Sequence, residues 1–316
     1  MATMQRGISI AMLALGGILL FAPKLPAQTP KITLPEEHGQ TIDGPGGKIY
    51  YEVTGGGSGT PLIVVNGGPG FDHRYEHITT AWDQIGKTRR IVFYDQRGNG
   101  QSSALKPGQS NTLADQMDDL EALRAHLGFD RIELLGHSWG GYLSMAYAAR
   151  HPEHIAHLIL VDSAAPKWSD IIFLFSQVFP EATERRAANT FADELGDRNA
   201  SDASMREYFS MLFYSPEKRD AFLAVMPADA FHKEVNRSLN ADLGRFDLNP
   251  EIRKFRFPVL VVTGRYDMNV APIVAYRMHQ AIPGSRFAVF ERSGHIPIYE
   301  EPDAFVRTLE GFLAGK

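Results

Sequence analysis

The sequence contains the pentapeptide Gly136-His137-Ser138-Trp139-Gly140, between the apolar run 132–135 and a helix-like run at 142–150. A G-x-S-x-G pentapeptide between a strand and a helix places the serine at the tip of a sharp turn, with its hydroxyl exposed. The turn strains the backbone and leaves no room for side chains at the flanking positions, which explains the glycines. We therefore expect Ser138 to be the nucleophile of a hydrolase of acyl compounds.

Short apolar runs alternate with helical patterns along the rest of the chain. Strands are predicted at residues 50–53, 62–65, 91–94, 132–135, 158–161, 259–262 and 287–290. Helices are predicted at residues 113–127, 142–150, 273–282 and 303–313. Apolar strands that alternate with helices indicate an α/β fold, with a mostly parallel sheet covered by helices on both faces. In such a sheet, ligands bind outside the carboxyl ends of the strands, where the glycine-rich and polar clusters fall.

Residues 165–252 break this alternation. The stretch is rich in helical patterns, at residues 171–179, 182–195, 204–214 and 216–225. We interpret it as a helical cap inserted between two strands, which leaves residues 28–164 and 253–316 as the core. The cap is expected to lie over the strand ends.

The first 27 residues have the pattern of a secretory signal peptide. Arg6 gives a positive start, residues 8–22 form an apolar run, and Ala27 supplies a small residue for cleavage. The run is shorter than the ~20 residues of a spanning helix, so we expect no stable membrane span in the mature chain. An uncleaved anchor is the alternative. We predict an exported protein, periplasmic or secreted; the absence of cysteine excludes disulfides and cysteine metal sites.

Composition and charge exclude several classes of partner. The formal charge of the 316-residue chain is −5, and removing residues 1–27 makes it more acidic, because that segment has two basic residues and no acidic one. A mildly acidic chain without a Lys/Arg-rich cluster is a poor candidate for nucleic-acid binding. We expect a small-molecule or short-peptide substrate, no cofactor, and no metal, since no H-E-x-x-H cluster is present. The sequence does not specify an oligomeric state.

A serine nucleophile needs a base and an acid that orients the base. In this strand–turn–helix architecture the chain order is Ser, then Asp or Glu, then His. His295, on a glycine-containing loop after the last predicted strand, is the expected base. Asp267, directly after the strand at 259–262, is the expected acid, and Asp162, after the strand at 158–161, is its competitor.

Two backbone N–H groups are expected to bind the oxyanion. One belongs to Trp139, the residue after the nucleophile, and the other to the loop after the first core strand. That loop reads Asn66-Gly67-Gly68-Pro69-Gly70. Gly68 is the predicted donor, with Gly67 as the next choice, because glycine lets the backbone approach a substrate carbonyl.

Several motifs resemble those of the α/β-hydrolase superfamily, and within it the proline iminopeptidase-like branch of serine peptidases. The resemblance covers about residues 38–316. The matching segments are Asn66-Gly67-Gly68-Pro69-Gly70, Asp95-Gln96-Arg97-Gly98-Asn99-Gly100-Gln101-Ser102, Gly136-His137-Ser138-Trp139-Gly140-Gly141, Gly264-Arg265-Tyr266-Asp267 and Ser293-Gly294-His295. The resemblance implies a core sheet with a helical cap and the release of N-terminal residues, often proline, from peptides.

The sequence departs from this branch at two places. Asn66 stands where the family loop has histidine, and the Trp-Glu signature that holds a substrate amine in several members is missing. Trp168 is the only tryptophan in the cap, and no glutamate follows it directly. Four other cap acids are candidate ligands of a substrate amine, namely Glu181, Glu184, Glu207 and Glu234.

Three functional hypotheses remain. The first is an aminopeptidase of proline iminopeptidase type that acts through an acyl-enzyme. The second is a carboxylesterase or lactonase with the same triad, and the third is a non-catalytic binding module. Dehalogenase and epoxide hydrolase activities need an aspartate at the nucleophile position and are excluded by Ser138.

Overall fold

The computed structural model describes Leu34 and residues 38–315, so the predicted signal segment 1–27 lies outside the described residues. The described residues fall within one compact unit. A search of their helices finds none that is long and apolar enough to cross a membrane.

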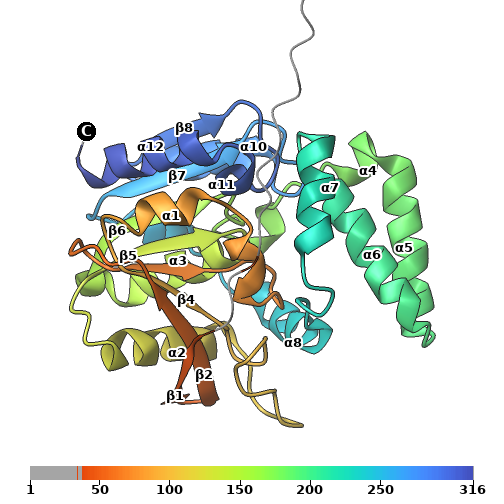
Figure 1. Cartoon of the computed structure of the whole chain (residues 1–316), viewed down its shortest axis with the longest axis horizontal. Helices are drawn as coiled ribbons and strands as arrows, with labels where there is room; N and C mark the ends of the chain where they lie inside the picture. The colour runs from red at the N-terminus through yellow and green to blue at the C-terminus, as the bar shows by residue number, and fades with distance from the viewer. Residues whose placement is uncertain (1–33, 35–37, 316) are drawn as a thin grey trace, which may run out of the picture. The chain divides into compact units, whose positions relative to one another are not determined.

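An eight-stranded sheet forms the centre of the described chain (Figure 1). Its strands are β1 (Gln40–Gly44), β2 (Gly47–Thr54), β3 (Leu62–Val65), β4 (Ile91–Tyr94), β5 (Ile132–His137), β6 (Ile155–Val161), β7 (Val259–Gly264) and β8 (Arg286–Phe290). They lie in the order β1-β2-β4-β3-β5-β6-β7-β8. The β1–β2 and β2–β4 pairs are antiparallel, and all later pairs are parallel. The carboxyl ends of β3 to β8 therefore share one edge of the sheet.

Helices cover both faces of the sheet. Successive strand residues point to opposite faces, so both faces present apolar side chains for the helices to bury. Ile63, Leu134 and Leu160 pack in one hydrophobic cluster, whereas Val64 and Leu135 pack in another. The first cluster includes residues of α2 (Leu113–His126), α3 (Trp139–Arg150) and α10 (Pro272–Ala281). The second includes residues of α1 (Ala81–Ile85), α11 (Pro297–Glu300) and α12 (Pro302–Leu313). The predicted α/β fold is confirmed.

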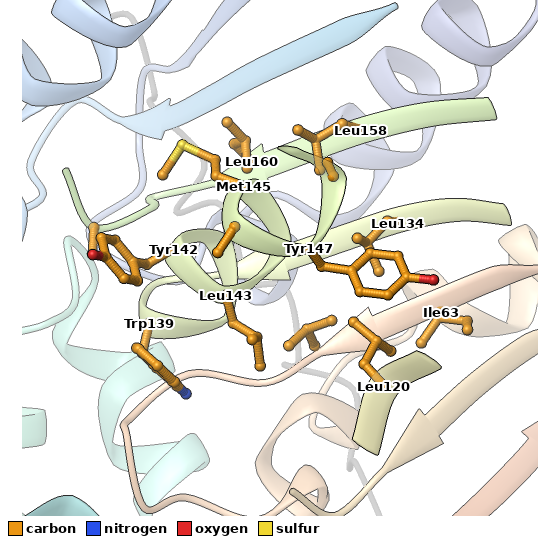
Figure 2. Close-up of a cluster of buried hydrophobic side chains, with 14 of the residues drawn as sticks. Ile63, Leu120, Leu134, Trp139, Tyr142, Leu143, Met145, Tyr147, Leu158 and Leu160 are labelled. Atoms are coloured by element: carbon orange, nitrogen blue, oxygen red, sulfur yellow. The ribbon is translucent and has the colours of Figure 1, made fainter. Parts of the chain in front are cut away.

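Helix α3 is the central helix of the first cluster. Residues 139–148 are all buried, as expected for a helix that is enclosed on every side. Figure 2 shows Leu143 and Tyr147 of this helix among side chains of the neighbouring strands and of α2. This packing fixes the start of α3, and with it the turn that carries Ser138.

Helix α2 begins where the sequence offers a capping pair. The Thr112 side chain accepts a hydrogen bond from the Asp115 N–H, and the Asp115 side chain accepts one from the Thr112 N–H. This reciprocal arrangement satisfies two backbone donors that the first helical turn leaves open. The predicted helix at 113–127 therefore has its start fixed locally.

A group of helices lies between β6 and β7, within the stretch predicted as a cap (Figure 1). They are η3 (Trp168–Asp170), α4 (Phe175–Val178), α5 (Pro180–Glu194), α6 (Arg198–Ser210), α7 (Pro216–Val225), α8 (Lys233–Leu243) and α9 (Asn249–Ile252). A β-bridge between Phe71 and Phe231 joins this stretch to the loop after β3. A second β-bridge, between Lys167 and Asp247, brings the start and the end of the stretch together.

Candidate active site

Ser138 occupies the turn between β5 and α3, in a strained backbone conformation with φ 56° and ψ −120°. The turn is tight because α3 starts directly against the end of β3. A Cβ on Gly140 would lie 1.9 Å from the carbonyl oxygen of Val65, so only glycine fits there. The Ser138 N–H donates to the carbonyl of Val161, 3.0 Å away, at the end of β6. Local sterics thus hold this serine at the sheet edge.

His295 and Asp267 meet on the loops after β8 and β7. His295 Nδ1 lies 2.8 Å from Asp267 Oδ2, and the two residues are 2% and 0% exposed. Asp267 Oδ1 accepts hydrogen bonds from the N–H groups of Asn269 and Val270, at 2.8 and 2.9 Å. Because a carboxylate only accepts, Nδ1 carries the proton and Nε2 is left with a lone pair. That tautomer is the one a general base requires.

The Asn269 amide is hydrogen-bonded to the Nε2 lone pair of His295. The sequence did not predict this contact. Asn269 Nδ2 lies 3.0 Å from His295 Nε2, and the tautomer just deduced makes the amide the donor. Among the described residues no hydrogen bond joins Ser138 Oγ to His295. The structure therefore brings the predicted acid and base into contact and leaves the base bonded to Asn269 instead of the serine.

Burial shifts the ionisation of both members of the pair. It lowers the pKa of His295 to about 3, with a further contribution from His137, and raises the pKa of Asp267 to about 7. Both shifts have the same cause, because a buried site disfavours the charged form of either group. An uncharged imidazole at neutral pH is the state that accepts a proton.

Asp162, the competing acid, lies at the end of β6 with an unusual φ of 43°. Polar atoms of Asp162, Asp267 and His295 all lie within 4.8 Å of one another. Asp162 Oδ1 accepts from the Gly264 N–H at 2.9 Å, but its buried Oδ2 has no hydrogen-bond partner among the described residues. Burial, and then the charge of Asp267, raise the pKa of Asp162 well above its usual value. These effects favour the uncharged form of the Asp162 carboxyl.

His137, the residue before the nucleophile, contacts the loop that carries His295. Its Nε2 lies 2.8 Å from the carbonyl oxygen of His295, so it donates to the backbone of the base loop. Its Nδ1 lies 2.8 Å from the Tyr75 hydroxyl and 3.5 Å from a carboxylate oxygen of Glu76. Burial opposes a charge on His137, but Glu76 outweighs it and raises the pKa of the imidazole. The residue before the serine thus supports the base loop.

The N–H groups of Gly67 and Gly68 in the loop Asn66–Gly70 differ in whether they have a partner. The Gly67 N–H donates to the Tyr75 hydroxyl at 2.5 Å, so the second-choice donor is already occupied. The Gly68 N–H, at a φ of +131° that favours glycine, has no hydrogen-bond partner in the part of the chain that the structure describes. Trp139 is the first residue of α3, where a helix leaves its N–H unpaired. These are the two predicted oxyanion donors.

Gln96 connects the loop and the helix that carry these two donors. Its Nε2 donates to the carbonyl oxygen of Asn66 at 2.9 Å, and its Oε1 accepts from the Trp139 indole N–H at 2.8 Å. Asn66, which stands where the family loop has histidine, donates from Nδ2 to the Phe71 carbonyl at 2.5 Å. One amide therefore ties the Asn66–Gly70 loop to the start of α3, and the asparagine closes the loop on itself.

The neighbouring Asp95 and Arg97 hold the architecture. Asp95 accepts from the backbone and the imidazole of His73, at 3.0 and 2.7 Å. Arg97 forms a paired contact with Asp119 of α2, at 2.5 and 2.7 Å. Neither side chain lines the cavity beside the serine.

The loop that carries His295 is attached to the connection between α6 and α7. The His295 N–H donates to the Leu212 carbonyl at 2.7 Å. The buried Glu300 carboxylate accepts from the N–H groups of Gly294, Tyr214 and Ser215, at 2.6, 3.0 and 2.9 Å. Burial raises the pKa of Glu300 to about 7. Core and inserted helices are therefore joined next to the base.

A cavity of about 410 Å³ opens beside Ser138. Its lining comes mostly from the inserted stretch, and its apolar residues include Phe71, Trp168, Phe173, Phe175, Met205 and Phe231. The polar residues in the lining are Asn236, Asn240, Asn269, Arg186, Tyr208 and Ser138. No carboxylate of the described chain lines this cavity. The four glutamates considered as amine ligands are elsewhere: Glu181, Glu184 and Glu234 are exposed, and Glu207 pairs with Arg185.

A second group of side chains has ligand types that metals use. Polar atoms of Glu52, His73 and His77 lie within 4.8 Å of one another. The Nε2 atoms of the two histidines are 3.5 and 3.3 Å from the Glu52 carboxylate, and His73 Nδ1 is 2.7 Å from Asp95. Despite burial, these contacts raise the pKa of His73 to about 10 and depress that of Glu52. The group forms a buried ion-pair network.

Comparison with known proteins identifies the family of the chain. The family model described as "alpha/beta hydrolase fold" matches residues 60–302. A proline iminopeptidase of Lactobacillus helveticus is 32% identical over 290 residues, covering 85% of this chain and 95% of that protein. A proline iminopeptidase of Clostridium botulinum is 30% identical over 287 residues, covering 84% and 94%.

Solved structures of related folds include esterases and a lactonase. A thermophilic esterase from Thermogutta terrifontis aligns with a TM-score of 0.68 at 25% identity, covering 88% of this chain and 99% of that one. The enol-lactonase from Burkholderia xenovorans LB400 aligns with a TM-score of 0.67 at 26% identity, covering 87% and 100%. With its fold, its serine turn and these relatives, the chain is a hydrolase of the α/β-hydrolase family, in the proline iminopeptidase-like branch.

Proposed function

We propose that the protein is a serine hydrolase that cleaves carboxylic esters or lactones through an acyl-enzyme. Ser138 is the nucleophile, His295 the general base and Asp267 the acid that orients the base. The hydrogen bond between His295 and Asp267 and the strained turn at Ser138 support these roles.

The proposed reaction has two steps. Ser138 Oγ attacks the substrate carbonyl and passes its proton to His295 Nε2, which gives that proton to the departing alkoxide. Water then attacks the acyl-enzyme, with His295 again accepting and returning a proton. Asp267 stabilises the imidazolium that forms in each step. For the first step, the Asn269 amide must leave Nε2, which substrate binding in the cavity can bring about because Asn269 lines it.

The oxyanion of each tetrahedral intermediate is proposed to bind the N–H groups of Gly68 and Trp139. Neither has a hydrogen-bond partner in the described chain, and Gln96 links the Asn66 carbonyl to the Trp139 indole. Donors that are fixed in advance stabilise the developing charge without reorganising. Removal of one such donor from an oxyanion hole typically costs about 3–4 kcal/mol of transition-state stabilisation.

One observation favours an ester or lactone over a peptide N-terminus. An N-terminal residue carries an ammonium group, which requires nearby carboxylates. The cavity beside Ser138 contains none among the described residues, and its charged lining residue is Arg186. An aminopeptidase activity is the second candidate, supported by the relatives named proline iminopeptidases.

A fluorophosphonate probe and a substrate panel test this proposal. The probe is expected to label the wild-type protein at Ser138, and Ser138→Ala is expected to lose both labelling and turnover. Ser169→Ala, which alters an exposed serine of the inserted stretch, serves as the control and should retain both. Labelling at another residue, or turnover by Ser138→Ala near the wild-type rate, would contradict the nucleophile assignment.

The panel compares short acyl esters and lactones with aminoacyl arylamides, including proline arylamide. Esters or lactones should be turned over with higher kcat/KM than any arylamide. Activity confined to arylamides would overturn the ester assignment and support the aminopeptidase.

We also propose that the protein is exported, on the strength of the pattern in residues 1–27. N-terminal sequencing of the protein recovered outside the cytoplasm should begin at Gln28. Recovery only from the cytoplasm, with residue 1 intact, would contradict this.

A further inference from the structure

Arg186 is a cation without an acidic partner in the cavity beside Ser138. No ion pair involving its guanidinium occurs among the described residues, although its carbonyl accepts a bond from Thr190. Its neighbour Arg185 provides the contrast, because it pairs with Glu207 at 2.7 Å and with Glu181 at 3.9 Å. Two adjacent arginines on α5 thus have different surroundings, one neutralised and one facing the cavity with its charge uncompensated.

The Arg186 side chain is held by an aromatic ring. Its guanidinium carbon lies 4.5 Å from the centroid of the Tyr208 ring, a cation–π distance. Tyr208 is itself fixed by edge contacts with Phe175 and Phe209, at 5.8 and 5.5 Å between ring centroids. Stacking uses the flat face of the guanidinium and leaves the N–H groups at its edge free to donate. The donors are therefore positioned before any ligand arrives.

The other polar groups of the cavity are neutral amides. Asn236 and Asn240 are joined by a hydrogen bond of 2.8 Å from Asn240 Nδ2, and Asn236 Nδ2 donates to the Pro69 carbonyl at 2.8 Å. Asn269 is bonded to His295. With no carboxylate in the described lining, Arg186 sets the sign of the charge that a ligand meets.

We propose that the substrate of this enzyme carries a carboxylate that pairs with Arg186 while its ester or lactone carbonyl lies at Ser138. The inference rests on the proposed serine hydrolase function and adds the substrate class. A planar guanidinium binds a carboxylate through two parallel N–H···O bonds, which also fixes orientation. The apolar residues that line the same cavity suit a hydrocarbon segment that joins the two ends of the substrate.

Three esters of similar length separate the possible positions of the carboxylate. 4-Nitrophenyl hydrogen glutarate carries it on the acyl side, 3-carboxy-4-nitrophenyl pentanoate on the leaving group, and 4-nitrophenyl pentanoate has none. The wild-type enzyme is expected to prefer one anionic ester over the neutral one by about 10- to 100-fold in kcat/KM, the range for a hydrogen bond to a charged group. The spontaneous hydrolysis rate of each ester is subtracted.

Substitutions of the neighbouring residues Arg186 and Arg185 form a matched pair of test and control variants. Arg186→Gln should remove the preference, lowering kcat/KM for the favoured anionic ester by about 10- to 100-fold while changing the neutral ester less than about threefold. Arg185→Gln removes a charge from the same helix outside the cavity and should leave both values unchanged. Thermal denaturation of both variants checks that they fold.

The outcomes distinguish a failure of carboxylate recognition from a failure of the proposed serine hydrolase function. Equal kcat/KM for neutral and anionic esters in the wild type, or an equal loss on all esters in Arg186→Gln, would overturn carboxylate recognition. Ser138 labelling would then still support the serine hydrolase. If Ser138 is not labelled and no ester is hydrolysed, both proposals fail.

Discussion

At the level of single residues, Asp162 and Asp267 are both buried carboxyl groups at neighbouring strand ends, but their partners differ. Asp267 accepts from two backbone N–H groups and contacts His295, whereas Asp162 accepts from the Gly264 N–H. Burial raises the pKa of both groups, but the two backbone donors oppose this shift at Asp267, whereas the charge of Asp267 adds to it at Asp162. The charged form is therefore better supported at Asp267 than at Asp162.

This difference predicts that Asp162 tolerates substitution by asparagine, whereas Asp267 does not. Asp267→Asn should lower kcat by about 10³- to 10⁴-fold, because the amide no longer holds the imidazole in the correct tautomer. Asp162→Asn should keep kcat within about tenfold of wild type, since the uncharged form is already favoured at this site and the amide oxygen still accepts from the Gly264 N–H. Steady-state kinetics on one ester measures both. A larger loss in Asp162→Asn than in Asp267→Asn would reverse the assignment.

The sequence predicted the acid and the base of the site, but not the residues that hydrogen-bond to the base and to its loop. Asp267 and His295 follow strands, so their common edge was deducible from the order of elements. Asn269 and His137 could not be assigned, because their roles depend on how two loops approach each other in space. A lone asparagine two residues after the acid, or a histidine before the serine, carries no pattern that identifies such contacts.

At the level of elements, α3 links the core to the serine turn. Leu143 is fully buried in the cluster shown in Figure 2. Leu143→Ala should reduce the free energy of unfolding by about 2–5 kcal/mol, through lost apolar contacts and the cavity that remains. Urea denaturation measures the change.

A control on the same helix separates packing from helix propensity. Arg150→Ala removes an exposed side chain paired with Asp118 at 2.8 Å and should cost less than about 1 kcal/mol. If the two variants lose equal stability, the packing argument for α3 is wrong.

The predicted strands at 62–65 and 91–94 coincide with β3 and β4, because all-apolar runs between polar segments mark buried strands. The strand at 50–53 extends to Gly47–Thr54 and pairs with β1, which was not predicted. Polar residues in Gln40–Gly44 give β1 little apolar signal, since only Ile42 in it is buried. Helix α3 starts three residues before the predicted 142 because the turn at Ser138 leads directly into it.

At the level of the whole molecule, the buried network of Glu52, His73, His77 and Asp95 joins β2, the short helix after the Asn66–Gly70 loop, and the end of β4. Tyr50 faces the same group, with its ring 5.6 Å from that of His73. These contacts raise the pKa of His73 from 6.5 to about 10. The charged imidazole is therefore part of the folded state at neutral pH.

This shift predicts how stability depends on pH. A histidine with a raised folded-state pKa contributes its full stabilisation below pH 6.5, and the contribution disappears as pH rises to about 10. The loss over that window should be roughly 3–5 kcal/mol, at about 1.4 kcal/mol per pKa unit. Urea titrations at several pH values measure it. His73→Asn should flatten the dependence, and His126→Asn, at an exposed position, should not; an unchanged slope in His73→Asn would refute the prediction.

The hydrogen bond from the His295 N–H to the Leu212 carbonyl limits which segments of this fold can be exchanged between family members. A segment that shares a backbone bond with the catalytic base is not an interchangeable module, even though it lies within an insertion. A chimera that receives its helices from another family member would need to retain residues 212–215 of this chain. Variation in substrate choice is then free to accumulate in α5 and α8, where a new side chain alters the cavity without displacing the imidazole.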